Sequence, residues 1–285
     1  MNANTYTFGI ELELAAPDSV IRNHGLRIGA YHVGTQVPFL PAGWTAQRDA
    51  SLSTSAGYTP CEIVSPILRG AEGIDEVIRV LAKLNELGFI IARNSGTHVH
   101  VGWDDAWGAE TLARLISIFS YLEKGLFATT GTRRREQGTY CKGIRKHGNA
   151  PKAKQALDPD RYSALNISNL ANNRTNKKTV EFRLFSGSLN ATKIVGWIQL
   201  CLGIVERAVE AKRLPTWEPK PATGGWKKGG IGQSECERLF GFLKWSDGYR
   251  RLNHGKQYGW ICDTISQDDV KKEFRRLAKK YDGEQ

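Results

Sequence analysis

The polar and apolar residues of three short stretches alternate in the same way. Tyr6–Leu14, Thr97–Val101 and Val180–Leu184 place apolar side chains at every second position, with polar or small residues between them. Because successive side chains of a β-strand point to opposite faces, each stretch is predicted to form a strand with one apolar face. The ionisable pairs on the other faces are Glu11 with Glu13, His98 with His100, and Glu181 with Arg183.

One strand of this kind would indicate no more than a solvated sheet face. Three of them favour a sheet that covers a core with one face and lines an ionic cleft with the other. A further strand over Cys61–Ser65, closed by Pro66, would add Glu62 to the cleft. The extended stretch Trp44–Leu52 adds Asp49 as another acidic candidate.

One further stretch is predicted to pair, as an antiparallel neighbour, with the last of the three strands named above. Arg161–Ile167 and Thr179–Phe185 both favour strands and are separated by the polar turn Asn172–Lys178. The pattern leaves open whether Tyr162 and Asn166 face the cleft or the core.

Other segments carry apolar residues at the three- and four-residue spacing of amphipathic helices. The order strand, helix, strand places the first of these helices on the apolar back of the sheet. The expected helices cover Glu72–Leu87, Ala109–Phe127, Asn190 or Thr192 to Lys212, Ser234 (opening a capping box) to Trp245, and a C-terminal segment capped by Ser266.

Two segments lack a clear period and are predicted to be long loops: Pro17–Pro41, with room for one turn of regular structure, and the basic stretch Thr129–Asp160. Residues 1–213 hold the strands and are expected to form one α+β domain. Residues 214–285 begin with a segment rich in Pro, Gly and Trp and are expected to form a helical extension.

Composition narrows the class of protein only in part. The net charge of +11 over 285 residues predicts attraction to anions such as nucleotides, nucleic acids or acidic polymers. The five cysteines are scattered without a Cys-x-x-Cys pair, so neither a zinc ribbon nor a disulfide framework is indicated. With no long apolar run and no signal pattern at the N-terminus, we expect a cytoplasmic protein that does not enter membranes.

The carboxylates of the predicted cleft constrain its chemistry. Several carboxylates can share a partly buried site only if cations compensate their charges. Oxygen ligands with one imidazole favour Mg²⁺ or Mn²⁺, although the His98/His100 pair alone could also begin a zinc site. Magnesium beside Arg183 and the tri-arginine segment Arg133–Arg135 is a layout for a nucleotide polyphosphate.

Five motifs in this order resemble those of the amidoligases, a family of carboxylate–amine ligases with the fold of glutamine synthetase and glutamate–cysteine ligase. The resemblance covers about residues 5–210. The motifs are Phe8–Glu13, Asp49–Leu52 with Cys61–Pro66, Gly96–Gly102, Arg161–Asn166 and Thr179–Phe185.

The resemblance implies an α+β fold in which a curved antiparallel sheet forms a funnel with helices on its outer face. It implies an ATP-dependent ligase that converts a small-molecule or peptide carboxylate into an acyl phosphate, which an amine then attacks. Residues 1–213 would then be the catalytic domain. By the family pattern Glu11, Glu13, Glu62 and Glu181 bind Mg²⁺ together with His98 or His100, of which His98 is preferred.

The same resemblance assigns Arg183 to the transferred phosphoryl group and Asp49 to the amine or metal end. Arg133, Arg134 and Arg135 are assigned to phosphate, with acidic substrate or solvent as alternatives. The basic surface also permits an acidic macromolecule as substrate. Two other functions fit the charge and the carboxylates: a metal-dependent nuclease, and a catalytically silent module that binds an anionic partner.

Overall fold

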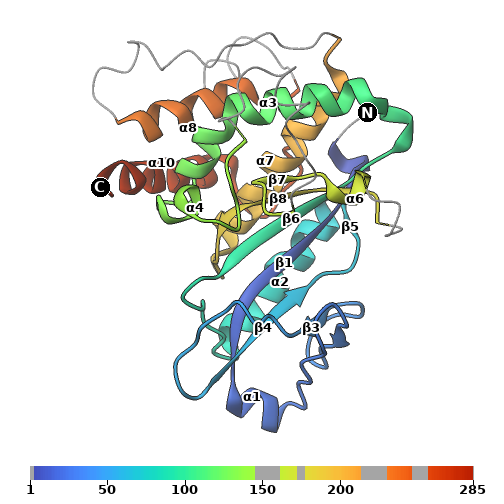
Figure 1. Cartoon of the computed structure of the whole chain (residues 1–285), viewed down its shortest axis with the longest axis vertical. Helices are drawn as coiled ribbons and strands as arrows, with labels where there is room; N and C mark the ends of the chain where they lie inside the picture. Colours follow the sequence, from blue (N-terminus) through green and yellow to red (C-terminus); the bar gives the residue numbers. More distant parts are fainter. Residues whose placement is uncertain (1–2, 145–160, 172–176, 213–229, 246–255, 285) are drawn as a thin grey trace.

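The strands of the protein form one curved antiparallel sheet (Figure 1). The computed structural model describes residues 3–144, 161–171, 177–212, 230–245 and 256–284. The strand order is β2-β3-β4-β1-β6-β8-β7, and β5 pairs with the start of β1. The strands are β1 (Thr7–Pro17), β2 (Thr35–Gln36), β3 (Thr45–Gln47), β4 (Tyr58–Val64), β5 (Leu68–Arg69), β6 (Gly96–Gly102), β7 (Leu165–Asn166) and β8 (Thr179–Ser186).

Helices cover one face of this sheet. Helix α7 contacts β6, α3 contacts β8, and α2 packs on α7, so these three form the layer behind the strands (Figure 1). The helices are α1 (Asp18–Asn23), α2 (Gly70–Glu86), α3 (Gly108–Ala128), α4 (Arg134–Gln137), α6 (Ser168–Ala171), α7 (Ala191–Glu210), α8 (Ile231–Phe242) and α10 (Gln267–Gly283), with 3₁₀ turns at Ala3–Thr5 and Asp105–Trp107. The expected α+β class with an antiparallel sheet is confirmed.

The alternation of β1 divides its residues between core and cleft as the sequence predicts. Phe8, Ile10 and Leu12 are at most 2% exposed and belong to the main hydrophobic core, whereas Glu11 and Glu13 point to the other face. Burying each such apolar side chain stabilises the fold by about 1.5–3 kcal/mol, which fixes the register because a one-residue slip would exchange the two faces.

The central strands align the ionisable residues across the sheet. Glu11 lies opposite His98, and Glu13 lies opposite Glu62. His100 lies opposite Glu181. Next to His98 the pairing of β6 with β8 contains a bulge, since two steps along β6 correspond to three steps from Phe182 to Phe185. The alternation of β8 therefore breaks after Arg183.

Several expected boundaries differ from the structure. Of the predicted strand Arg161–Ile167 only β7 pairs with β8, in the expected antiparallel sense. The predicted loop Pro17–Pro41 contains α1 and β2, and Thr129–Asp160 contains α4, with 145–160 outside the described residues. Most of the predicted turn Asn172–Lys178 also lies outside the described residues.

The expected capping box at Ser234 is wrong. Helix α8 begins three residues earlier, at Ile231, and its first free amides are bound by a residue from α10. The Asp282 carboxylate accepts hydrogen bonds from the amides of Gly232, at 2.6 Å, and Gln233, at 3.0 Å. Asn190 and Ser266 do cap α7 and α10 as expected.

The described part of the C-terminal segment packs on the rest of the chain. Helix α8 lies along α3, and α10 packs on α7 and α8 (Figure 1). Leu239 of α8 and Phe274 of α10 are fully buried and belong to the same hydrophobic core as the residues behind the sheet. Within the described ranges, no helix combines the length and apolar character that crossing a membrane requires.

Candidate active site

The polar face of the sheet forms the floor of a large cleft. The cleft has a volume of about 1630 Å³, which exceeds the 300–1,000 Å³ typical of a pocket for one small molecule. The cleft is lined by residues from β1, β3, β4, β6, β7 and β8. The segment that follows α3 and part of α10 also line it. The cleft is therefore large enough for more than one substrate.

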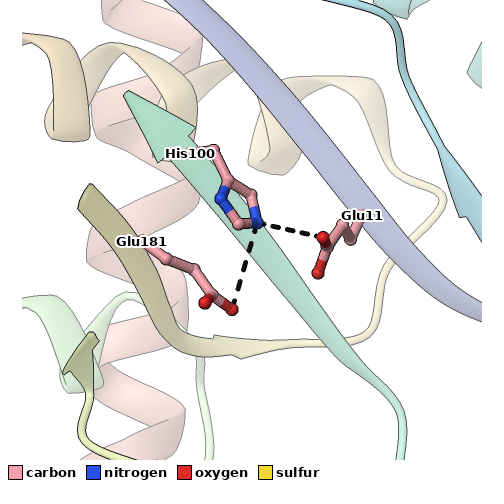
Figure 2. Close-up of side chains that lie close together, drawn as sticks. All are labelled: Glu11, His100 and Glu181. Atoms are coloured by element: carbon pink, nitrogen blue, oxygen red, sulfur yellow. Dashed lines mark ion pairs between the residues drawn. The ribbon is translucent and has the colours of Figure 1, made fainter. Parts of the chain in front are cut away.

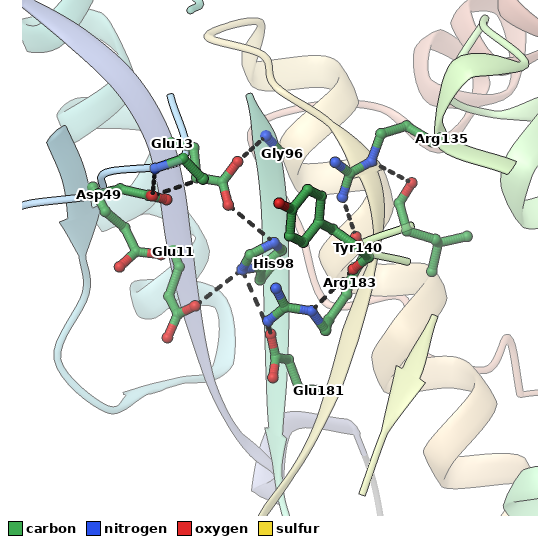
Figure 3. Close-up of polar contacts among 12 residues, drawn as sticks. Glu11, Glu13, Asp49, Gly96, His98, Arg135, Tyr140, Glu181 and Arg183 are labelled. Carbon is green, nitrogen blue, oxygen red and sulfur yellow. Dashed lines mark hydrogen bonds and ion pairs between the residues drawn. The ribbon is translucent and has the colours of Figure 1, made fainter. Parts of the chain in front are cut away.

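His98 lies at the centre of the acidic cluster and is 3% exposed (Figure 3). Its Nδ1 atom lies 3.0 Å from Glu11 Oε2 and 3.5 Å from Glu181 Oε1. Its Nε2 atom lies 3.4 Å from Glu13 Oε1. One imidazole thus touches three carboxylates from two strands that are far apart in the chain, because β6 lies between β1 and β8.

His100, two residues after His98 on β6, contacts two of the same carboxylates, Glu11 and Glu181 (Figure 2). Its Nε2 atom lies 3.1 Å from Glu11 Oε1 and 4.0 Å from Glu181 Oε1. Burial alone would lower the pKa of His100, but the charges of Glu11 and Glu181 outweigh it and raise the pKa to about 9. Burial would likewise raise the pKa of Glu11, but His100 and His98 hold it well below its usual value.

Glu62 is the carboxylate whose ionised form is most clearly disfavoured by its surroundings. It is 9% exposed, and its Oε2 atom accepts a hydrogen bond from the Gln47 side chain on the neighbouring strand. Burial, together with the charges of Glu11, Glu13 and Asp49, raises the pKa of Glu62 to about 8. The metal-free cleft therefore contains more negative charge at this end than its own cations compensate.

Glu13 and Arg135 meet at the glycine that begins β6 (Figure 3). The amide of Gly96 donates a hydrogen bond to Glu13 Oε2, and the Arg135 guanidinium donates hydrogen bonds to the carbonyls of Arg183 and Leu184. A Cβ atom on Gly96 would lie 2.9 Å from Arg135 Nη2, so only glycine leaves room for this arginine.

Glu181 is 4% exposed and is held from two sides. Asn166 Nδ2 donates a hydrogen bond of 2.7 Å to Glu181 Oε2, and Arg183 forms an ion pair with Oε1 (Figure 3). Burial alone would lower the pKa of Arg183, but the charges of Glu181 and Glu11 outweigh burial and raise this pKa above its usual value. The question that the sequence left open is thus answered for Asn166, which faces the cleft.

Within the part of the chain that the structure describes, two overlapping groups of side chains could each hold a metal ion. Glu11, His100 and Glu181 place one ligand atom each within 4.8 Å of one another, and so do Glu11, Glu62 and His98. The donors are mainly carboxylate oxygens, which suits Mg²⁺ or Mn²⁺. The residues therefore fit divalent cations.

Of the other predicted residues, some line the cleft and one does not. Asp49 lines the cleft, where its Oδ1 atom accepts hydrogen bonds from the amide and hydroxyl of Ser51 at 2.8 and 2.7 Å. Arg134 and Arg135 also line the cleft. Arg133 does not; its guanidinium lies over the Tyr281 ring of α10, 5.1 Å from the centroid.

The sequence reasoning missed two groups of cleft residues. Gln47 lies two positions before Asp49, so the period of a strand could have indicated it. Lys193 of α7 and Arg276 and Lys280 of α10 also line the cleft. The four-residue spacing of Arg276 and Lys280 on a predicted helix shows that they share a face, but nothing in the sequence shows which element that face meets.

The family of the protein follows from its sequence once this geometry is known. A sheet that gathers buried carboxylates, imidazoles and an arginine in a cleft is the arrangement of an active site. A sequence model of the family described as "Putative amidoligase enzyme" matches residues 4–150 and 145–205. The chain therefore belongs to this amidoligase family.

Solved structures add only a distant likeness. The chain is similar to a bifunctional glutathione synthetase from Pasteurella multocida (TM-score 0.47, 12% identity, 98% of this chain and 48% of that one). It is also similar to a chain in the complex of the prokaryotic ubiquitin-like protein Pup with its ligase PafA (TM-score 0.49, 11% identity, 98% of this chain and 64% of that one). The chain thus spans about half to two thirds of these neighbours. Among curated proteins no match was found.

Proposed function

We propose that this protein is a carbon–nitrogen ligase that joins a carboxylate to an amine, uses ATP and Mg²⁺, and proceeds through an acyl phosphate. The observation that carries the proposal is the convergence of carboxylates from β1, β4 and β8 with the imidazoles of β6 on one side of one sheet. Such a cluster holds cations, and cations beside an arginine bind polyphosphate. Amide formation from a carboxylate needs activation, which transfer of a phosphoryl group supplies.

The two overlapping ligand groups would hold the metal ions. Glu11 belongs to both, and we assign Glu181 with His100 to one group and Glu62 with His98 to the other. Glu13 lies within 3.4 Å of His98 and completes the cluster. Magnesium held by these residues would supply positive charge that offsets the negative charge of the phosphates.

The chain's own side chains would then position the reacting groups. In the metal-free cleft Arg183 pairs with Glu181, and in the loaded cleft we assign it to the transferred phosphoryl group. Asn166 keeps its hydrogen bond to Glu181 and so holds the carboxylate when Arg183 turns to phosphate. Asp49 lies beside Glu62 at the cleft wall, where it could bind the incoming amine.

The reaction that follows balances without any further reactant. A carboxylate oxygen of the acid attacks the γ-phosphorus of ATP, and ADP leaves. The amine nitrogen then attacks the carbonyl carbon of the acyl phosphate, phosphate leaves, and the amine proton passes to solvent or to a cleft carboxylate.

The test is release of ADP in the presence of Mg²⁺ and a panel of amino acids and amines, with the product identified by its mass. We expect ADP release to depend on both an acid and an amine and to fall by about 10²–10³ in Glu181→Gln, because the substitution removes a carboxylate assigned to the metal ion that would stabilise charge on the transferred phosphoryl group. Glu86→Gln, an exposed carboxylate at the end of α2, is the matched control and should retain full activity.

Two results would contradict the proposal. One is metal-dependent cleavage of DNA or RNA without ATP that is lost in Glu181→Gln, which would identify the nuclease instead. The other is amide formation that proceeds with ADP release unchanged by removal of Mg²⁺ and Mn²⁺.

A further inference from the structure

Helix α10 forms one wall of the active-site cleft, although the family model ends at residue 205. Arg276, Leu277 and Lys280 of α10 line the cleft together with Glu284, which follows the helix. Lys193, in the first turn of α7, lines the same wall. The cleft of this chain is therefore completed by a segment outside the family match.

The contacts of α10 place this wall at the end of the sheet where β8 finishes. Ser186, the last residue of β8, donates a hydrogen bond to the carbonyl of Thr130 at 3.4 Å. Two residues further on, the Thr132 hydroxyl donates to Glu284 Oε2 at 2.8 Å. The amide of Arg133 also donates to Glu284 Oε2 at 2.8 Å. Helix α10 thus adjoins the Gly96 and Ser186 end of the cleft.

Positive charge gathers at this end. Burial lowers the pKa of Lys193; the charge of Glu273 opposes this effect, whereas the charges of Arg276 and Lys280 add to it, so both cations lie near Lys193. Glu273 binds Arg276 through two contacts of 2.8 and 2.7 Å and lies 3.9 Å from Lys193. Lys280 is exposed on the cleft side of the same helix.

We propose that Lys193, Arg276 and Lys280 form a subsite for a carboxylate-rich part of the acid substrate, so that α10 sets the substrate class of this ligase. The assignment to the acid substrate rests on the proposed function. Glu273 offsets only part of the charge of these three cations, and a bound anion would remove the repulsion that remains among them.

Carboxylates are favoured over a nucleotide at this end because a different part of the cleft suits a nucleotide. Tyr140 and Tyr162 contact each other with centroids 5.5 Å apart, and Arg161 reaches from the Tyr162 ring to the Tyr31 hydroxyl. The Tyr140 carbonyl accepts a hydrogen bond of 3.4 Å from Arg183. Aromatic faces suit a nucleobase, and they adjoin the arginine assigned to the phosphoryl group.

The test measures binding by calorimetry, so it does not depend on turnover. The probes are a tetraglutamate peptide, a tetraglutamine peptide and Mg·ATP. The variants of the full chain are R276E/K280E and the matched control K272E/K279E, which changes the net charge of the same helix equally at exposed positions that do not line the cleft. Thermal unfolding of each variant checks that the fold is retained.

We expect tetraglutamate to bind the wild type and the control, and to bind R276E/K280E at least about tenfold more weakly, as the loss of close charge pairs predicts. Lys280→Glu alone, which leaves the Arg276–Glu273 pair in place, should show an intermediate loss. Tetraglutamine should bind no form measurably, and Mg·ATP should bind all forms with affinities within about twofold.

Three results would overturn the subsite. Equal weakening in both double variants would show a general charge effect, and weaker Mg·ATP with unchanged tetraglutamate would show a phosphate site. Failure of the wild type to bind tetraglutamate would also refute it. A protein that binds tetraglutamate as expected but releases no ADP with any acid and amine would refute the proposed function and leave the subsite standing.

Discussion

Replacing Glu62 by glutamine tests the idea that the cleft stores repulsion between carboxylates until metal binds. Glutamine has nearly the same size as glutamate, and its amide oxygen can still accept the hydrogen bond from Gln47. The substitution removes only the ability to ionise. It should therefore stabilise the metal-free protein at the pH values where Glu62 is charged and weaken the binding of metal.

The magnitude follows from the pKa of Glu62, which lies at about 8 against an ordinary value of 4.5. The difference of about 3.5 units, at about 1.4 kcal/mol per unit, sets an upper limit of about 5 kcal/mol on the stability that is lost when Glu62 ionises. Coupling to Glu11 reduces the expected loss to about 2–4 kcal/mol. The folded state binds the proton of Glu62 more tightly than the unfolded state does. The stability that this proton contributes is therefore fully present below pH 4.5 and is lost as the pH rises through 8.

Urea unfolding at pH 5.5 and at pH 8.5, in EDTA and in excess Mg²⁺, measures the effect. In EDTA we expect Glu62→Gln to be about 1 kcal/mol more stable than the wild type at pH 5.5 and about 2–4 kcal/mol more stable at pH 8.5. In Mg²⁺ the wild type should gain stability through binding, and the variant should gain less. Glu86→Gln serves as the control for loss of an exposed carboxylate and should show no such pH dependence.

One outcome would refute this reasoning outright. If Glu62→Gln in EDTA is less stable than the wild type at pH 8.5 by the same amount as at pH 5.5, the carboxylates do not repel one another in the folded protein. The cluster would then be a hydrogen-bonded structural element and not an incomplete metal site.

Two further predictions follow from single contacts. Arg183→Lys should lower kcat for ADP release by about 10² while the KM for the amine changes little, because lysine keeps the charge but cannot form the paired hydrogen bonds of a guanidinium; an unchanged kcat would remove Arg183 from the phosphoryl site. Asp282→Ala should lower the free energy of unfolding by about 1–2 kcal/mol, because the amides of Gly232 and Gln233 lose their cap, and equal urea midpoints would contradict this.

The sequence predicts the strands well wherever their alternation is regular. Glu11 and Glu13 face the cleft as expected, because exchanging the faces of β1 would expose four core residues. The alternation could not predict the bulge of β8, where Leu184 and Phe185 are both fully buried. Phe185 stacks on Trp197 of α7 with centroids 4.9 Å apart, a contact between distant segments that a local pattern does not contain.

The residues of the candidate site were predictable where they belong to strands, and Asp49, Arg134 and Arg135 were also predicted, whereas the cleft residues of α7 and α10 were not. Motifs that resemble a family indicated Glu62 and Glu181 directly. The cations of α10 could not be assigned to the cleft, because their position depends on how α10 packs against α7 and α3. The cap of α8 was missed for the same reason, since Asp282 lies about 50 residues from the amides that it binds.

The charges of the cleft are arranged so that metal binding and anion binding support each other. Among the described residues that line it, the carboxylates Glu11, Glu13, Glu62 and Glu181 share the floor, whereas Arg134, Lys193, Arg276 and Lys280 occupy the wall near α10. Without metal, the acidic floor repels a polyphosphate and partly offsets the field of the basic wall. Divalent cations on the floor would reverse its sign and leave the whole cleft positive, so nucleotide and acidic substrate should both bind more tightly after the metal.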